Sequence, residues 1–272
     1  MASVELGPYR LEIPEEFGPR ITGLTRDDGP DLFARLDETV VLRRAGAEPY
    51  LFHGGHRLWA SPEIPELTYA PDARDSDLAE DDGVVRVRAA ADEAGLVKEL
   101  RVTAVGESLR VDHRLSGARR PVAAWGITQL RLGGTAILAL PRSDTAPLPD
   151  RSIVVWPYTD MGDSRLSIAD DHITIEAIGD PPLKLGTGPV RSRLGYLLEG
   201  WLFEKTSEFA RGDVPDLGAA SQVYVGQGFC ELETVGVLRS PGEPALLTET
   251  WHLSPCGGLD DAVARLTDSA PA

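Results

Sequence analysis

The sequence predicts an all-β fold in which two large antiparallel sheets pack against each other. Short segments with strand patterning follow one another along the 272 residues, separated by 28 glycines and 21 prolines, and this spacing is typical of packed sheets. Helical periodicity is clear only over residues 259–266, which predicts a short C-terminal helix. We find no internal repeat, low-complexity segment or linker, so residues 1–272 are expected to form a single domain.

The strands expected along the chain are short and bounded by turn residues. Residues 109–115 show the clearest pattern, because Leu109 and Val111 alternate with polar residues, as in an antiparallel strand with one face in water. Residues 72–82 hold six acidic side chains and are expected to form a solvated loop rather than a cation site. The other expected strands are residues 9–13, 20–24, 32–36, 84–89, 97–105, 122–130, 136–140, 152–156, 172–177, 194–203, 221–225, 229–235 and 245–253.

The composition limits the class of protein. The chain carries 43 acidic and 27 basic residues, a formal net charge of −16, which argues against binding to nucleic acid or to an anionic membrane surface. The N-terminal residues lack the basic and apolar regions of a signal peptide, and no apolar run approaches the roughly 18 residues of a membrane span. A cytoplasmic protein is therefore expected. The two cysteines, Cys230 and Cys256, form neither a disulfide framework nor a metal-ligand spacing.

Residues 229–235 (Phe-Cys-Glu-Leu-Glu-Thr-Val) carry the most informative pattern. Because side chains alternate along a strand, Glu231 and Glu233 share one face with Phe229 and Val235. Acidic side chains are seldom buried unless they are paired, and a partly desolvated carboxylate has a raised pKa that suits proton transfer. Taken alone, the pattern is also that of an exposed strand face with two acids.

Read in order, several segments resemble the galactose mutarotase-like (aldose 1-epimerase) superfamily. They are residues 18–24 (GPRITGL), 54–59 (GGHRLW), 62–63 (PE), 95–102 (GLVKELRV), 125–130 (WGITQL), 229–234 (FCELET), 241–243 (PGE) and 248–251 (TETW). No single segment is specific, and their order along nearly the whole chain carries the resemblance. The resemblance implies a β-supersandwich with a sugar-sized cleft, a small-molecule carbohydrate as ligand, and no cofactor or metal.

The reaction that this resemblance implies is the interconversion of the α and β anomers of an aldose. A base takes the proton of the anomeric hydroxyl while an acid protonates the ring oxygen, and each transfer contributes about 10²–10⁴ in rate. The family's base is a Glu in a Leu-Glu-Thr-like strand, which matches Glu233, with Glu231 as the alternative register. The family's substrate-binding Arg matches Arg57, whose planar fork can hold two sugar oxygens.

The acid is the part of the family pattern that this sequence does not reproduce. The family carries one His in a Leu-His-Gly-Gly-like loop and a second in an Asn-His-like segment. His53 stands in a similar Phe-His-Gly-Gly stretch, but this stretch runs directly into the Arg57 segment and is therefore out of order. The candidates are His56, which neighbours Arg57, and His113, one strand before the second position; each can also be an ordinary loop or strand residue.

Two further residues are candidates for the cleft or its rim, and a third is unusual for its surroundings. Trp125 matches a family position, and the C–H face of a sugar stacks well on an indole. Asp160, in the segment 156–160, can accept hydrogen bonds from sugar hydroxyls or simply cap a turn. Lys184 is isolated in an apolar strand of a chain with only three lysines, and a snorkelling side chain is its default interpretation.

Two functions are therefore expected: an aldose 1-epimerase-like isomerase, or a non-catalytic carbohydrate-binding protein on the same fold. Other enzyme classes lack their motifs, because the sequence contains no Gly-rich phosphate loop before a helix, no Gly-x-Ser-x-Gly elbow and no His-Glu-x-x-His. Nothing in the sequence sets the oligomeric state.

Overall fold

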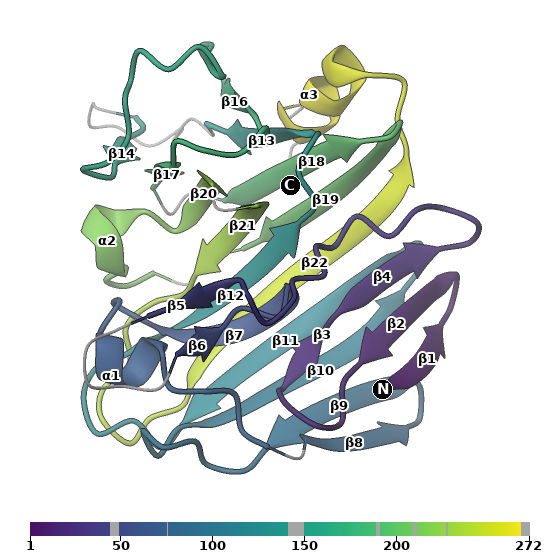
Figure 1. Cartoon of the computed structure of the whole chain (residues 1–272), viewed down its shortest axis with the longest axis vertical. Coiled ribbons are helices and arrows are strands. Elements are labelled where there is room, and N and C mark those ends of the chain that lie inside the picture. Colours follow the sequence, from purple (N-terminus) through teal and green to yellow (C-terminus); the bar gives the residue numbers. More distant parts are fainter. Residues whose placement is uncertain are drawn as a thin grey trace.

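Antiparallel strands make up most of the described chain. The computed structural model describes residues 1–43, 49–74, 76–140, 150–188, 191–208, 211–226 and 228–267 (Figure 1). Within these residues, all pairings between neighbouring strands are antiparallel. Two large sheets dominate, and their inner faces are packed together.

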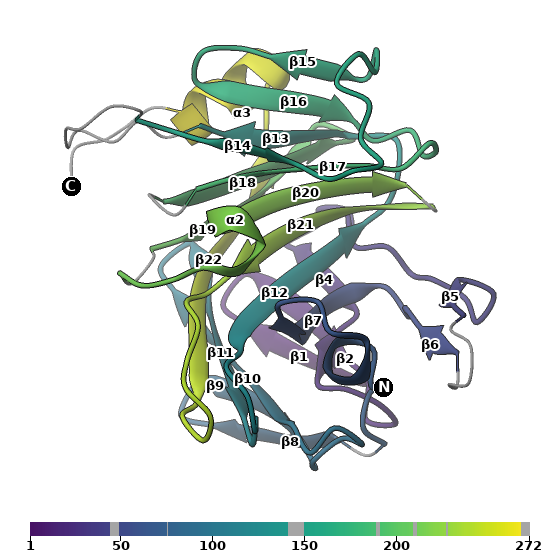
Figure 2. The same ribbon diagram turned by 90° about the vertical axis from the view of Figure 1, so that its left-hand side faces the viewer.

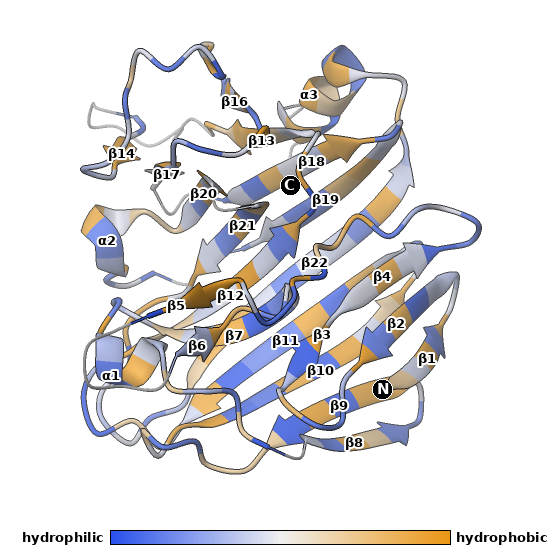
Figure 3. Ribbon diagram, in the orientation of Figure 1, coloured by the Kyte–Doolittle hydropathy of each residue, from blue (hydrophilic) through white to orange (hydrophobic). Residues whose placement is uncertain are grey.

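The larger sheet has ten strands. In spatial order they are β15 (Leu166–Ile168), β16 (His172–Glu176), β13 (Thr135–Ala139), β18 (Ser192–Leu198), β19 (Trp201–Ser207), β22 (Ala245–Pro255), β11 (Ser108–Ser116), β10 (Val97–Val105), β9 (Val84–Ala89) and β8 (Ser76–Asp81). Hydrophobic and hydrophilic residues alternate along β10 and β11, as Figure 3 shows. This alternation buries one face of the sheet and leaves the other in solvent.

The second large sheet has seven strands. In spatial order they are β14 (Ile153–Val155), β17 (Leu183–Thr187), β20 (Ser221–Gly226), β21 (Phe229–Val235), β12 (Ala123–Leu130), β7 (Gly55–Ser61) and β3 (Arg20–Ile21). The neighbouring strands β20, β21 and β12 run side by side across Figure 2. Every residue of β7, β12 and β21 is buried, so both faces of the centre of this sheet are covered.

The two faces of the seven-stranded sheet contribute to different apolar clusters. The inner face joins the ten-stranded sheet in the main core, whose members include Leu58, Val223 and Leu232 from one sheet and Leu100 and Val111 from the other. The opposite face carries a more aromatic cluster, which includes Tyr50, Phe52, Trp59, Trp125, Ile127 and Phe229. Because side chains alternate along each strand, neighbouring residues of β7, β12 and β21 belong to opposite faces.

Smaller elements complete the described chain. A three-stranded sheet is formed by β1 (Ala2–Leu6), β2 (Tyr9–Ile13) and β4 (Gly23–Arg26), and a two-stranded one by β5 (Val41–Leu42) and β6 (Tyr50–Leu51). The helices are α1 (Pro65–Thr68), α2 (Pro215–Gly218) and the amphipathic α3 (Leu259–Thr267), which packs on β13 and β18. None of these helices has the length and apolar character needed to cross a membrane.

The prediction of an all-β fold with two large antiparallel sheets and a short C-terminal helix is confirmed. That residues 1–272 form one domain stays a prediction. The strand expected over residues 194–203 is wrong in one respect, because a two-residue turn divides it into β18 and β19. Glu199 and Gly200 form this turn with φ of 54° and 74°, the conformation that joins tight antiparallel hairpins.

Three other local expectations are corrected. Residues 32–36 form no strand and make only the isolated bridges at Phe33 and Arg35. The acidic segment 72–82 is not all loop, because Ser76–Asp81 forms the edge strand β8, where charged side chains discourage further pairing. No strand was expected over Gly55–Ser61, yet β7 lies near the centre of its sheet; with both faces buried, it lacks the alternation that marks a half-exposed strand.

Candidate functional site

The two glutamates of β21 are buried on the aromatic face of the seven-stranded sheet. Glu233 is fully buried and Glu231 is 8% exposed, so the simpler interpretation of an exposed acidic strand face is excluded. The alternation predicted from the sequence holds, because Phe229 lies in the aromatic cluster while Cys230 and Leu232 lie in the main core. Buried carboxylates need partners, and each glutamate has its own set.

Glu233 is held by a lysine and an indole. Its Oε2 accepts a hydrogen bond from Nζ of Lys184 at 2.7 Å and one from Nε1 of Trp125 at 2.9 Å. Burial raises the pKa of Glu233 from 4.5 to about 7; the Glu231 carboxylate adds to this rise, while the Lys184 ammonium opposes it. A carboxylate whose pKa lies near neutrality suits general base catalysis, because a large share of it is deprotonated near neutral pH and that share is basic enough to take a proton.

Glu231 is held by an arginine and an amide. Its Oε1 accepts hydrogen bonds from Nη2 of Arg57 and from Nε2 of Gln129, each at 3.0 Å. The strand register explains this convergence. Gln129 is paired directly with Glu231, and Ile127 is paired on one side with Glu233 and on the other with Arg57. Arg57 and Glu233 therefore face the same way two strands apart, with roughly 10 Å between their backbones.

The position of Arg57 is fixed by aromatic rings. Its guanidinium carbon lies 4.0 Å from the centroid of the Trp59 ring and 5.5 Å from that of Phe52, and a stacked guanidinium keeps its in-plane donors available. Trp59 is fixed in turn, because its Nε1 donates to the hydroxyl of Tyr50, 2.9 Å away. Arg20, fully buried, donates to the same hydroxyl at 2.9 Å.

Arg57, Trp59 and Glu231 line a cleft of about 360 Å³. Glu233 is not exposed in this cleft but contacts Trp125 and Lys184, which line it. The floor of the cleft is the sheet, and its walls come from residues that flank β6 and α1 and from the segment between β14 and β15. The lining residues include Phe52, Arg57, Glu63, Trp59, Tyr69, Trp125, Trp156, Tyr158, Lys184, Tyr224, Phe229 and Glu231. The volume lies at the low end of the roughly 300–1,000 Å³ range of small-molecule sites. A small ligand with both apolar and hydroxyl groups fits such a lining.

Several buried polar atoms at this site have no hydrogen-bond partner among the described residues. They are Nε and Nη1 of Arg57, Oε1 of Gln129, Oε1 of Gln222 and Oε1 of Glu233. Gln129 and Gln222 pair directly with Glu231 and Glu233 and so face the same way. Buried polar groups in native proteins are nearly always hydrogen-bonded, so this concentration of donors and acceptors indicates a place where a polar ligand binds.

His56 and His113 are not brought to this cleft. Both lie between the two large sheets, and their side chains are buried. His56 is next to Arg57 on β7, so its side chain points to the opposite face of the sheet. Nε2 of His56 lies 2.7 Å from Nε2 of His113, and Nδ1 of His56 lies 2.9 Å from Oγ1 of Thr128. Nδ1 of His113 donates to the Leu247 carbonyl at 3.1 Å. Each ring nitrogen therefore has a partner in the interior.

The interior histidines and Glu249 are the described group that comes nearest to a metal site. One ligand atom from each of His56, His113 and Glu249 lies within 4.8 Å of the others. However, the two imidazoles are hydrogen-bonded to each other, and Nζ of Lys205 lies 3.1 Å from Oε1 of Glu249. A bound cation would have to displace the lysine from this carboxylate, so these residues fit a polar core better than a metal centre.

The other predicted site residues are divided. Trp125 lines the cleft and contacts Glu233, as described above. Asp160 is exposed and its Oδ1 accepts a hydrogen bond from the amide of Gly162 at 2.8 Å, which is the turn-capping role of an Asp. All five histidines lie in the described part of the chain, and none of them lines the cleft.

Lys184 is the most important residue whose role the sequence left undecided. It is 5% exposed, so it does not snorkel to the solvent. Its ammonium lies 4.9 Å and 4.8 Å from the ring centroids of Trp125 and Trp156. Its isolation in an apolar strand was the signal, but its partner lies 49 residues away, on a strand whose place in the sheet cannot be read from the sequence.

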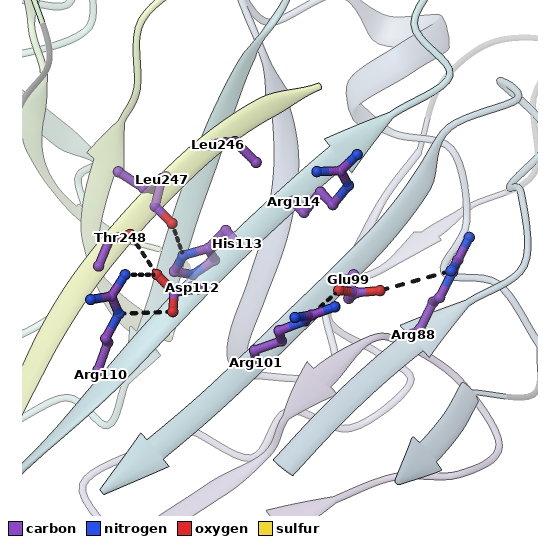
Figure 4. A pocket seen from close by; sticks show the side chains of 10 residues that line it. All are labelled: Arg88, Glu99, Arg101, Arg110, Asp112, His113, Arg114, Leu246, Leu247 and Thr248. Carbon is purple, nitrogen blue, oxygen red and sulfur yellow. Dashed lines mark hydrogen bonds and ion pairs between the residues drawn. The ribbon is translucent and has the colours of Figure 1, made fainter. Parts of the chain in front are cut away.

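A larger hollow, of about 450 Å³, lies on the outer face of the ten-stranded sheet and has a different character (Figure 4). Arg88 and Arg101 both face Glu99, and Arg110 forms two hydrogen bonds with Asp112 (Figure 4). Because these arginine side chains are at least half exposed, their ion pairs are those of a solvated sheet face, which contribute little to stability. We therefore place the candidate site in the smaller, more buried cleft.

The comparisons with known proteins agree on the fold. A galactose mutarotase-like protein from Lactobacillus casei ATCC 334 superimposes with a TM-score of 0.56 at 10% identity, over 93% of this chain and 100% of its own. The fold is that of the galactose mutarotase-like proteins. A protein from Synechocystis sp. PCC 6803 gives a TM-score of 0.55 at 14% identity, over 93% of this chain and 96% of its own.

The same fold also occurs within a longer protein. A TPR-domain containing protein from Parabacteroides distasonis ATCC 8503 gives a TM-score of 0.58 at 12% identity, over 99% of this chain and 49% of its own. No protein-family model matches the sequence, and a search of curated proteins finds no match. At these identities the likeness establishes the fold that the resemblance implied, while the chemistry has to be argued from the cleft.

Proposed function

We propose that this cleft binds a monosaccharide and interconverts its α and β anomers, with Glu233 as the general base. The observation that carries the proposal is the state of Glu233. It is a buried carboxylate with a pKa raised by burial to about 7, and its Oε1 has no partner among the described residues. A carboxylate in this state can accept the proton of an anomeric hydroxyl at neutral pH.

The lining of the cleft supports a sugar as the ligand. The faces of tryptophan rings can stack on the C–H groups of a sugar, and Trp59, Trp125 and Trp156 all contribute to the walls. Arg57 presents a fixed guanidinium with two unpartnered nitrogens, which can donate to neighbouring hydroxyls. The cavity volume of about 360 Å³ favours one sugar unit over a longer chain.

The charges of the cleft favour an uncharged aldose over a sugar phosphate. Both cations of the lining are already paired, Arg57 with Glu231 and Lys184 with Glu233. Glu63 adds another acidic side chain to the wall. A phosphate would have to compete with these carboxylates for each cation and would be repelled by them.

The second candidate is carbohydrate binding without turnover. The observation that favours it is that none of the five histidines lines the cleft, although the family resemblance implies a histidine as the acid. A sugar held by Arg57 and the tryptophans would then be bound without a proton reaching its ring oxygen.

Polarimetry separates these candidates. Freshly dissolved pure anomers of several aldoses are followed with the wild-type protein and with Glu233→Gln, while calorimetry measures binding. We expect the wild-type protein to accelerate mutarotation and Glu233→Gln to lose about 10²–10⁴ of this rate while still binding sugar. Binding without acceleration by the wild-type protein would favour the second candidate, and neither binding nor acceleration across the sugars would overturn the proposal.

A further inference from the structure

The cleft has few groups that can deliver a proton. Arginine effectively never releases its proton, which excludes Arg57. Tyr69, Tyr158 and Tyr224 line the cleft, but burial raises the pKa of each phenol above its usual range, so they hold their protons more tightly. Among the described lining residues, this leaves the ammonium of Lys184 as the donor nearest to Glu233.

Lys184 is only partly committed to the protein. An ammonium carries three N–H donors, and the described residues give it a single hydrogen-bond acceptor, Oε2 of Glu233 at 2.7 Å. The rings of Trp125 and Trp156 also lie near the ammonium, and an aromatic face is a weaker acceptor than a carboxylate oxygen. Lys205 differs, since its ammonium donates to the carbonyl oxygens of Gly126 and Leu232 and to Oγ1 of Thr128.

The short distance between Lys184 and Glu233 suits the chemistry of a hemiacetal. The anomeric hydroxyl oxygen O1 and the ring oxygen O5 are bonded to the same carbon, C1, so the two proton transfers occur side by side. An acid and a base separated by one hydrogen bond can reach both oxygens at once. Arg57 and Glu233 are more widely separated, because their strands lie two apart in the sheet. A sugar ring would have to lie between these two side chains to contact both.

We infer that Lys184 is the catalytic acid that protonates the ring oxygen, in place of a histidine; this inference rests on the proposed function. Glu233 takes the proton of O1–H as the C1=O1 double bond forms. The C1–O5 bond breaks with its electron pair going to O5, which takes a proton from Lys184. Neutral carboxylic acid and neutral amine remain.

Ring closure reverses these steps on the other face of C1. After rotation about C1–C2, O5 adds to C1 and its proton passes to the Lys184 amine, while the Glu233 carboxylic acid returns its proton to O1. The pair is restored, and no further reactant is consumed. Trp125 and Trp156 stabilise the ammonium through their ring faces, so the charged form is ready for the next sugar.

Lys184→Arg tests the role of the lysine as an acid. Arginine keeps the positive charge beside Glu233 but effectively never releases its proton. We expect sugar binding to be retained and kcat to fall by about 10²–10⁴. Lys98→Arg is the matched control, because Lys98 is also buried and paired, with Asp92 at 3.0 Å, but lies outside the cleft. This control should keep the wild-type kcat and KM.

Chemical rescue gives a second, independent measurement. In Lys184→Ala, added alkylammonium ions should restore part of the rate, and the restored rate should depend on the pKa of the amine. Full kcat in Lys184→Arg, or the absence of rescue in folded Lys184→Ala, would overturn the inference while the wild-type activity upheld the proposed function. A wild-type protein that does not accelerate mutarotation would instead overturn the proposed function and the inference together.

Discussion

Two buried lysines lie on opposite faces of the seven-stranded sheet, and their surroundings show how these faces differ. Lys205, between the sheets, donates to three oxygen atoms and lies 3.1 Å from Glu249. Lys184, at the cleft, has one carboxylate and two indole rings. The interior face surrounds its cation with protein acceptors, whereas the cleft face leaves two of the three ammonium donors without an acceptor among the described residues. Such buried and unused donors are available to a polar ligand.

The largest expected effect is the loss of stability when Lys205 is replaced. Lys205→Met leaves Glu249 and the carbonyl oxygens beneath the sheet without their cation, which should lower the free energy of unfolding by about 3–5 kcal/mol. Urea unfolding measures this loss. The folded fraction should keep its rate of anomer interconversion, because Lys205 does not line the cleft.

Lys184→Met is the matched variant on the other face. At pH 6 it should cost less stability, since Glu233, with a pKa raised to about 7, is largely protonated at that pH and depends less on its cation. Equal losses of stability in the two variants would contradict the distinction between the faces.

The pH dependence of stability sharpens the comparison. The pKa of Glu233 is raised from 4.5 to about 7 in the folded protein, so between these pH values the native state binds a proton that the unfolded chain has released. The free energy of unfolding should therefore fall by about 3 kcal/mol as pH rises through this window. The charged or titratable groups around Glu233 are Lys184, Arg57, Glu231, Tyr158 and Tyr224 on the cleft face and Lys205 and Cys230 on the interior face.

Glu233→Gln isolates this contribution, because glutamine does not titrate. Relative to the wild-type protein, the variant should gain stability as pH rises from about 4.5 to about 7, as measured by urea unfolding at each pH. A stability difference that is independent of pH would show that Glu233 has an ordinary pKa and would remove the basis for its role as a base.

The smallest of these effects concerns Arg57. Arg57→Lys keeps the charge but loses the planar fork, so KM for the sugar should rise by about tenfold, with a smaller change in kcat. Steady-state polarimetry gives both constants. Arg110→Lys on the solvated outer face serves as the control and should change neither, while an unchanged KM in Arg57→Lys would argue against a direct contact with sugar.

Much of the fold could be predicted from the sequence because it depends on local patterns. The strand expected over residues 229–235 has the same limits as β21. That Glu231 and Glu233 lie on one face of this strand follows from the two-residue strand period alone. The hairpin at Glu199 and Gly200 was missed because both flanking strands are apolar and read as one.

The candidate site was harder to predict because sheet order joins distant segments. His56 was an attractive acid as the neighbour of Arg57, but neighbours on a strand point to opposite faces, and β7 was not recognised as a strand. The contact between Lys184 and Glu233 depends on β20 lying between β17 and β21, an order that no local pattern encodes.

The most direct test of the account compares two adjacent residues of β21 that face opposite ways. Glu233 contacts the cleft residues Trp125 and Lys184, while Thr234 faces the interior, and both are fully buried. NMR exchange spectroscopy on an aldose gives the rate of anomer interconversion with Glu233→Gln and with the nearly isosteric Thr234→Val. We expect the first variant to lose about 10²–10⁴ of the enzymatic rate and the folded second variant to keep it. Equal rates in the two variants would contradict the claim that the cleft face carries the chemistry.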